Sequence, residues 1–122
     1  MIQKVAFTMY PVQDAARARA FYEGILGLTI GANGQFGDRF WLEYDLPGGG
    51  CIALTNATPG APGSGSTIAL EVSDLDALIA HLRSHDVPLH GEVVRGPHCR
   101  MQPCEDPDGN PLLLHQLDPG HT

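Results

Sequence analysis

A tight turn near the C-terminus constrains this chain more than any other feature. Asp108-Gly109 stands between two runs with strand character. This dipeptide is the strongest short-range signal of a β-hairpin, because glycine adopts positive φ without steric cost. Pro107 presets φ for a turn, while Pro111 is tolerated only at the first position of a strand or at a sheet edge. The apolar run 112–117 is therefore predicted to be the second strand of a hairpin.

Length and composition restrict the class of protein. The chain has 122 residues, the size of one domain with one core, and we expect a single domain spanning residues 1–122. Its 43% of hydrophobic and 17% of charged residues are typical of a globular protein. No apolar run approaches the ~20 residues that a membrane span needs. The first residues lack the basic start and long apolar core of a secretory signal.

Charge and cysteine content narrow the partners and the compartment. The net charge of −7 argues against nucleic acid and anionic membranes as partners, because phosphate binding needs a basic face. Cys51, Cys99 and Cys104 are odd in number and lack Cys-x-x-Cys spacing. This pattern argues against a disulfide framework and favours a reducing compartment, so a cytoplasmic protein is expected.

Two segments have helical periodicity. The first begins after Asp14, a suitable N-cap, and ends before Gly27, which stands where a C′ glycine belongs. In the second, Ser73 or Asp74 caps a run whose apolar pattern ends before Pro88. The runs with strand character are residues 2–10, 28–32, 39–45 and 51–55 in the first half, and residues 67–72, 88–94, 99–103 and 112–117 in the second.

The order of elements is therefore βαβββ twice, joined by a Gly/Pro/Ser-rich linker at residues 58–66. The two aspartate caps lie about sixty positions apart, as an internal duplication of pattern would give. One helix covers only one face of each four-stranded sheet. We predict an α+β fold in which modules 1–57 and 67–117 form a curved mixed-sheet cup, with the helices on its outer face.

Three short motifs stand out along this predicted order of elements. They are Asp14 with residues 21–23 and 26–28, the run 68–72, and the run 105–110. In these motifs the chain resembles the vicinal oxygen chelate superfamily, which includes glyoxalase I, bleomycin-resistance proteins and extradiol dioxygenases. The resemblance extends over nearly the whole chain. It implies the duplicated module and, because relatives commonly pair, a homodimer.

The resemblance also implies where a metal would bind. In metal-dependent relatives, four strands each supply a His, Glu or Gln ligand to a divalent cation. Counted from the matched motifs, these positions are Phe7, Ala53, Thr67 and Leu113. Three of these side chains have no donor atom, and a single threonine hydroxyl is a poor ligand. We therefore expect no metal and no other cofactor, which argues against glyoxalase-type chemistry and places the chain nearer to the metal-free bleomycin-resistance proteins.

Side chains alternate between the two faces of a strand, so these positions fix their neighbours. Met9 accompanies Phe7, and His115 accompanies Leu113. The predicted cup is largely apolar with a few polar groups, as expected for an organic ligand. For His115, a hydrogen bond near the strand end is the alternative to a ligand contact or a role as a base.

Arg100 and Gln102 are placed on the cup face, because the face covered by a helix is expected to be the apolar one. Arg100 either recognises an anion or carbonyl group of the ligand or pairs across strands with Glu71 or Glu43.

The run 39–45 leaves one orientation open. Trp41 and Tyr44 must lie on opposite faces of the strand, and Glu43 shares the face of Trp41. If that face is the cup, Glu43 is a candidate general base. The predicted ligand-binding residues are Phe7, Met9, Trp41, Glu43, Ala53, Thr67, Arg100, Gln102, Leu113 and His115.

Three functions compete. The first is metal-free binding of a small, largely apolar or aromatic molecule, of the resistance or sequestration type. The second is a lyase, isomerase or dioxygenase with absent or non-standard metal ligands, with proton transfer by His115 and Arg100 as one possibility. The non-standard metal site would be drawn from His98, His115, Glu43 and Glu71. The third is an interaction module that uses uncovered strand edges.

Overall fold

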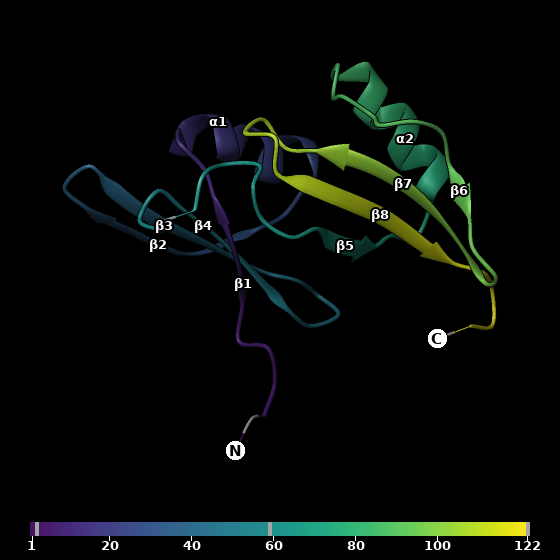
Figure 1. Cartoon of the computed structure of the whole chain (residues 1–122), viewed down its shortest axis with the longest axis horizontal. Helices are drawn as coiled ribbons and strands as arrows, with labels where there is room; N and C mark the ends of the chain where they lie inside the picture. The colour runs from purple at the N-terminus through teal and green to yellow at the C-terminus, as the bar shows by residue number, and fades with distance from the viewer. Residues whose placement is uncertain (2, 59, 122) are drawn as a thin grey trace. The chain divides into compact units, whose positions relative to one another are not determined.

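The computed structural model describes residues 1, 3–58 and 60–121. The chain forms two compact units, Met1–Gly65 and Ser66–Thr122. Within the described residues, each unit holds one four-stranded mixed sheet and one helical segment (Figure 1). The predicted α+β class is confirmed. No helix in the described ranges is long and apolar enough to cross a membrane.

The first unit has a sheet in the order β1-β4-β3-β2. Strand β1 is parallel to β4, and the other neighbours are antiparallel. Its strands are β1 (Thr8–Pro11), β2 (Ile30–Phe36), β3 (Arg39–Asp45) and β4 (Cys51–Thr55). Its helical segment begins as α1 (Ala15–Arg19) and continues as the π-helix η1 (Ala20–Ile25).

The predicted ends of the first helix are correct, but its winding changes within it. The Asp14 carboxylate accepts a hydrogen bond from the Arg17 amide at 3.1 Å, as an N-cap should. Gly27 follows the helix with φ of +76°, which suits glycine. Between them the last turns widen, and the Leu26 amide donates to the Phe21 carbonyl, five residues back, at 2.9 Å. Apolar periodicity does not distinguish this wider turn from an α-helix.

Strand β3 joins this helical segment to the sheet. Its buried residues alternate with more exposed ones, so Phe40, Leu42 and Tyr44 form the buried side. The Tyr44 ring stacks on Tyr22 of η1 at a centroid separation of 5.9 Å. This packing identifies the face of the first sheet that its helix covers.

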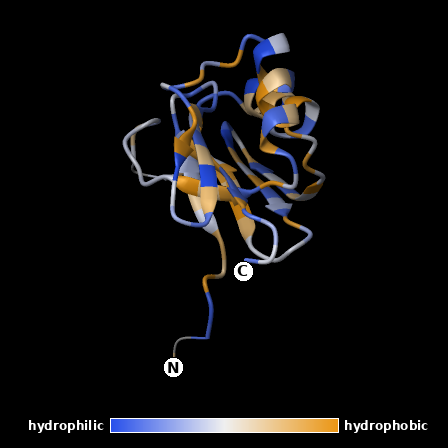
Figure 2. Ribbon diagram, turned by 90° about the vertical axis from the view of Figure 1, so that its right-hand side faces the viewer, coloured by the Kyte–Doolittle hydropathy of each residue, from blue (hydrophilic) through white to orange (hydrophobic). Residues whose placement is uncertain are grey.

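The second unit has a sheet in the order β5-β8-β7-β6, with β5 parallel to β8. Its elements are β5 (Ile68–Glu71), α2 (Leu75–Ser84), β6 (Val94–Arg95), β7 (Cys99–Glu105) and β8 (Pro111–Leu117). Figure 1 shows α2 lying across β7 and β8. Polar and apolar residues are interspersed along the strands and helices, as elements with one buried side require (Figure 2).

The hairpin between β7 and β8 forms as predicted. The Asp106 amide donates to the Asn110 carbonyl at 3.0 Å, and Gly109 has φ of +82°. The buried Asp106 carboxylate accepts from the amides of Asp108 and Asn110. These hydrogen bonds satisfy backbone amides of the turn, so the Asp106 side chain stabilises the turn itself.

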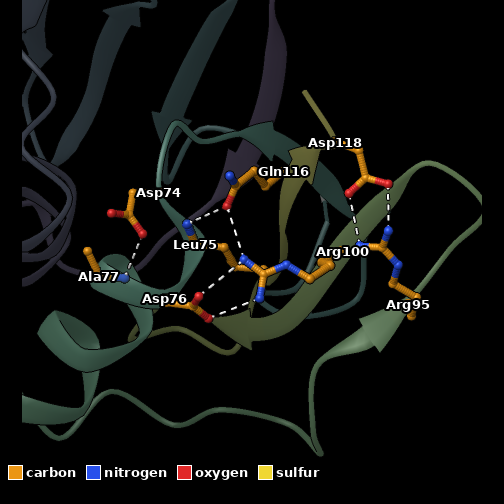
Figure 3. A network of polar contacts seen from close by, with 8 residues as sticks. All are labelled: Asp74, Leu75, Asp76, Ala77, Arg95, Arg100, Gln116 and Asp118. Atoms are coloured by element: carbon orange, nitrogen blue, oxygen red, sulfur yellow. Dashed lines mark hydrogen bonds and ion pairs between the residues drawn. The ribbon is translucent and has the colours of Figure 1, made fainter. Parts of the chain in front are cut away.

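Helix α2 is held to its sheet by polar contacts (Figure 3). The Asp74 carboxylate accepts from the Ala77 amide at 3.0 Å, and the Gln116 amide oxygen accepts from the Leu75 amide at 2.7 Å. Two otherwise unpaired donors of the first helical turn are thereby satisfied. Asp74, rather than Ser73, is the N-cap.

Two predicted strands, residues 39–45 and 51–55, have the same bounds in the structure, and three others differ by only one or two residues at an end. The remaining three differ more. The first begins only at Thr8, and Ile2 lies outside the described residues. The second is shifted toward the C-terminus, because Gly37-Asp38 closes a hairpin between β2 and β3. The strand predicted at residues 88–94 is largely wrong. Leu89 makes only an isolated bridge to Cys104, and regular pairing begins at Val94.

Candidate functional site

Each sheet has one face opposite its helix, which we call its helix-free face. On β3 this face carries Trp41 and Glu43, because Phe40, Leu42 and Tyr44 are on the buried, helix-covered side. The structure thus decides the orientation that the sequence left open. Trp41, and not Tyr44, belongs to the helix-free face of the first unit.

The pairing register adds the neighbouring strands to this face. Ala53 lies opposite both Glu43 and Met9. Phe7, just before β1, packs edge-on against Trp41 with ring centroids 5.3 Å apart. Phe7 and Met9 are 43% and 40% exposed, whereas Ala53 is fully buried. All the predicted ligand-binding residues of the first unit therefore lie on its helix-free face. They are Phe7, Met9, Trp41, Glu43 and Ala53.

Glu43 is already held by two neighbours on this face. The Trp41 indole Nε1–H donates to Glu43 Oε2 at 2.7 Å, and the Cys51 thiol donates to Glu43 Oε1 at 3.7 Å. Burial raises the pKa of the Cys51 thiol, and the nearby carboxylates of Glu43 and Asp45 raise it further. Cys51 is therefore a neutral thiol at neutral pH, and not an activated nucleophile.

The helix-free face of the second unit carries a His–Glu pair. Register places His115 of β8 between Glu71 of β5 and Met101 of β7. His115 Nδ1 lies 2.6 Å from Glu71 Oε1, and the Leu117 amide donates to Glu71 Oε2 at 2.8 Å. The Leu117 amide hydrogen bond lowers the pKa of Glu71, with a further contribution from His115 and against an opposing effect of desolvation. Glu71 is absent from the predicted ligand-binding residues. The sequence does indicate its face, because Glu71 stands two positions after Ala69 in the same strand and so points to the same side.

Arg100 and Gln102 lie on the opposite, helix-covered face, which corrects the sequence prediction. They pair with Gln116 and Leu114 of β8. The Arg100 guanidinium donates to Asp76 of α2 at 3.1 Å (Figure 3).

Gln102 is 1% exposed and donates to the Pro103 carbonyl at 2.9 Å and to the Gly91 carbonyl at 3.3 Å. The assumption that a helix-covered face must be apolar is wrong here. The Arg100 guanidinium and the Gln102 side-chain amide both find hydrogen-bond partners nearby. Within the described residues of the second unit, the alternative pairing of Arg100 with Glu71 does not occur either, because Arg100 donates to Asp76 and Glu71 contacts His115.

The four positions inferred for metal ligands do not fit a divalent cation. Ala53 and Leu113 lie in strands, Phe7 packs edge-on against Trp41, and Thr67 is exposed just before β5 rather than within it. Only Thr67 among them has a side-chain donor atom. The described residues contain no group of three or more His, Cys, Asp or Glu side chains placed to hold a metal ion. Of the alternative set, Glu71 contacts His115 and the Leu117 amide within the second unit, and His98 stacks on His121.

Solved structures resemble this chain along most of its length. TnmS3, an antibiotic binding protein from Streptomyces sp. CB03234, is 29% identical with a TM-score of 0.84, over 96% of this chain and 98% of that one. A glyoxalase/bleomycin resistance protein from the same organism is also 29% identical, with a TM-score of 0.79 over 90% and 97% of the two chains. The trypanothione-dependent glyoxalase I of Leishmania major is 24% identical, with a TM-score of 0.73 over 96% and 87%, and shares the fold.

Among curated proteins, none matches the sequence significantly. Residues 4–114 match the family described as the Glyoxalase/Bleomycin resistance protein/Dioxygenase superfamily. This match covers most of the chain and agrees with the motifs of the hairpin and the first helix. The chain therefore belongs to the glyoxalase/bleomycin resistance protein/dioxygenase superfamily.

Proposed function

We propose that this protein binds a small, largely apolar or aromatic organic molecule without a metal ion, and that it protects against that molecule by sequestering it. The observation that carries the proposal is the chemistry at Phe7, Ala53, Thr67 and Leu113, three of which have no side-chain atom that could bind a metal ion. The similarity to TnmS3, named an antibiotic binding protein, supports an antibiotic as the ligand.

The helix-free face of the first unit supplies a surface suited to such a molecule. Phe7 and Trp41 present an edge-to-face aromatic pair, and Met9 adds a flexible thioether beside it. Aromatic and methionine side chains are the common lining of sites for organic ligands. Glu43 is the polar group of this surface, with both carboxylate oxygens already engaged by Trp41 and Cys51.

In the second unit, Leu113 and His115 are the predicted contacts that lie on the helix-free face. Arg100 and Gln102 are left out of the proposed site, because their polar groups are engaged on the other face of that sheet. We further propose that the protein is a cytoplasmic homodimer, because the free cysteines favour a reducing compartment and the resemblance to pairing relatives favours a dimer. Sedimentation equilibrium at micromolar concentration tests the dimer, and a monomer mass would contradict it.

Trp41 provides the test of binding, because it is the single tryptophan in the sequence. The purified protein is titrated with a panel of aromatic antibiotics and with a highly polar aminoglycoside as a negative control. Saturable quenching of tryptophan emission by at least one aromatic compound, and none by the aminoglycoside, is expected. Absence of binding across the aromatic panel, or equal binding of the aminoglycoside, would overturn the proposal.

A further inference from the structure

Hydrogen bonds hold the side chains of His115 and Glu71 in a defined orientation on the helix-free face of the second unit. Glu71 accepts from the Leu117 amide through one carboxylate oxygen and contacts His115 Nδ1 through the other. The carboxylate is thus fixed at both oxygens, and it fixes the imidazole ring in turn. An imidazole oriented by a carboxylate at one nitrogen presents the other nitrogen in a defined direction.

The charge state of Glu71 determines which nitrogen of His115 is available. Its lowered pKa keeps Glu71 ionised at neutral pH, so the carboxylate accepts hydrogen bonds only. Nδ1 must then carry the proton in the 2.6 Å contact. In the neutral imidazole, Nε2 is left as the acceptor, and no described residue forms a hydrogen bond with it.

Apart from Glu71, whose side chain is 52% exposed, the neighbours of His115 on its own sheet face are apolar. Along β8, His115 shares its face with Leu113 and Leu117, and Met101 is its partner on β7. The His115 side chain remains 25% exposed, so a ligand on this face can reach it. A single oriented acceptor within an apolar surface selects a ligand that has one matching donor.

The second unit contains another His–Glu pair, His90 with Glu105, which differs from His115 with Glu71 in exposure and in support from the backbone. His90 Nε2 lies 3.0 Å from Glu105 Oε2, but the His90 side chain is 54% exposed and belongs to no strand. Among the described residues, no backbone amide donates to the Glu105 carboxylate, whereas Glu71 accepts a hydrogen bond from the Leu117 amide. His90 therefore offers a matched control of the same chemistry without the fixed orientation.

We propose that His115 recognises a weakly acidic hydroxyl group, of the phenol or enol class, on the bound organic molecule. This inference rests on the proposed binding function and names the chemical class of its ligand. The hydroxyl O–H lies against Nε2, and its proton passes to that nitrogen. The products are an imidazolium, stabilised by Glu71 at Nδ1, and a phenolate or enolate that stays paired with the new N–H. No bond between carbon and oxygen changes, and the proton is returned when the ligand leaves.

Two small probes test this assignment. 4-Nitrophenol has an acidic hydroxyl, and its phenolate is yellow whereas the phenol is colourless. 4-Nitroanisole has the same ring and nitro group with a methyl ether in place of the hydroxyl. Both are titrated against the whole protein by isothermal titration calorimetry, at a pH about one unit below the phenol's own pKa. Absorbance of the phenolate is recorded in the same samples.

The inference predicts that 4-nitrophenol binds about tenfold more tightly than 4-nitroanisole, because a charge-assisted hydrogen bond forms only with the phenol. It also predicts that phenolate absorbance rises as the protein saturates. In His115→Gln the phenolate signal is lost and the affinity for 4-nitrophenol falls to that for 4-nitroanisole. The far-UV circular dichroism spectrum and the urea midpoint of this variant, compared with those of the unmodified protein, show that the fold is retained.

Glu71 acts as a positioning residue, so Glu71→Gln should reduce the phenolate signal while the affinity for 4-nitroanisole is retained. His90→Gln should change neither quantity. Equal affinities for the two probes without a phenolate signal, or a phenolate signal that persists in His115→Gln, would overturn the inference. Failure of both probes to bind would also contradict it. The antibiotic panel decides the proposed binding function separately.

Discussion

The indole nitrogen of Trp41 lies 2.7 Å from Glu43 Oε2, on the face of β3 opposite to Tyr44. This relationship orients the Trp41 ring on the face that also carries Phe7 and Met9. Tyr44, only three positions along the chain, is fully buried and belongs to the helix-covered face. The two aromatic residues thus belong to opposite faces of one strand, and the proposed binding function assigns only Trp41 to the ligand.

Trp41→Ala should weaken binding of an aromatic ligand by at least about tenfold, because a large aromatic contact surface is lost. Isothermal titration calorimetry measures this effect without tryptophan fluorescence. Trp41→Phe is the conservative comparison and should retain most of the affinity, since it keeps an aromatic ring beside Phe7. Equal affinities of Trp41→Ala and the unmodified protein would exclude this face as the binding surface.

Tyr44→Phe should reduce stability and leave ligand affinity unchanged. The Tyr44 hydroxyl donates to Glu23 Oε2 at 2.9 Å, and burial raises the pKa of Tyr44, so the donor stays protonated. Loss of a hydrogen bond to a charged group costs about 1–3 kcal/mol of unfolding free energy. Urea denaturation measures the loss, and a weaker affinity at unchanged stability would contradict the assignment of Tyr44 to the core.

Glu23 should make stability depend on pH in the acid range. The Arg19 side-chain hydrogen bond lowers the pKa of Glu23, and Tyr44 contributes in the same direction. A carboxylate with a lowered folded pKa stabilises the protein above its unfolded pKa of about 4.3, and this contribution is lost as pH falls through the folded pKa.

Glu23→Gln should therefore be less stable than the unmodified protein at pH 7, and the difference should shrink by pH 3. Urea midpoints at the two pH values measure it. Glu92→Gln, which alters an exposed glutamate, is the control and should not change the pH dependence. A stability difference for Glu23→Gln that is as large at pH 3 as at pH 7 would contradict the role of the carboxylate.

Gln116→Ala should destabilise the second unit, because the Leu75 amide at the start of α2 loses its acceptor. Loss of a helix-capping hydrogen bond typically costs about 1 kcal/mol. Hydrogen exchange of amides in α2 measures the local effect, which should exceed that in the first unit. Uniform exchange rates across the chain in this variant would argue against a capping role.

Much of the fold is encoded in local patterns. Asp14, Asp74 and Gly109 each satisfy a specific backbone requirement, and the structure has them where the sequence indicates. Residues 88–94 were mispredicted because a few β-favouring side chains do not ensure a pairing partner. In the structure, the amide of His90 bonds to the Pro103 carbonyl outside any regular strand pairing.

The candidate site was only partly predictable, because faces depend on register. Alternation correctly grouped Met9, Ala53 and Glu43 once the pairing of β3 and β4 was known. The placement of Arg100 and Gln102 failed for another reason: the helix-covered face was assumed to be apolar, whereas their polar groups reach partners that only the folded chain brings near. The contact between His115 and Glu71 joins residues 44 positions apart, and parallel pairing of β5 with β8 creates it.

Binding with and without metal tests the central claim most directly. The protein is dialysed against a chelator, its metal content is measured by elemental analysis, and it is titrated with the tightest aromatic ligand by Trp41 emission. The same titration is repeated after addition of Zn²⁺, Ni²⁺, Mn²⁺ or Fe²⁺. The proposed function predicts the same dissociation constant in every sample and no stoichiometric bound metal. Binding that disappears on chelation and returns with one of these ions would contradict it.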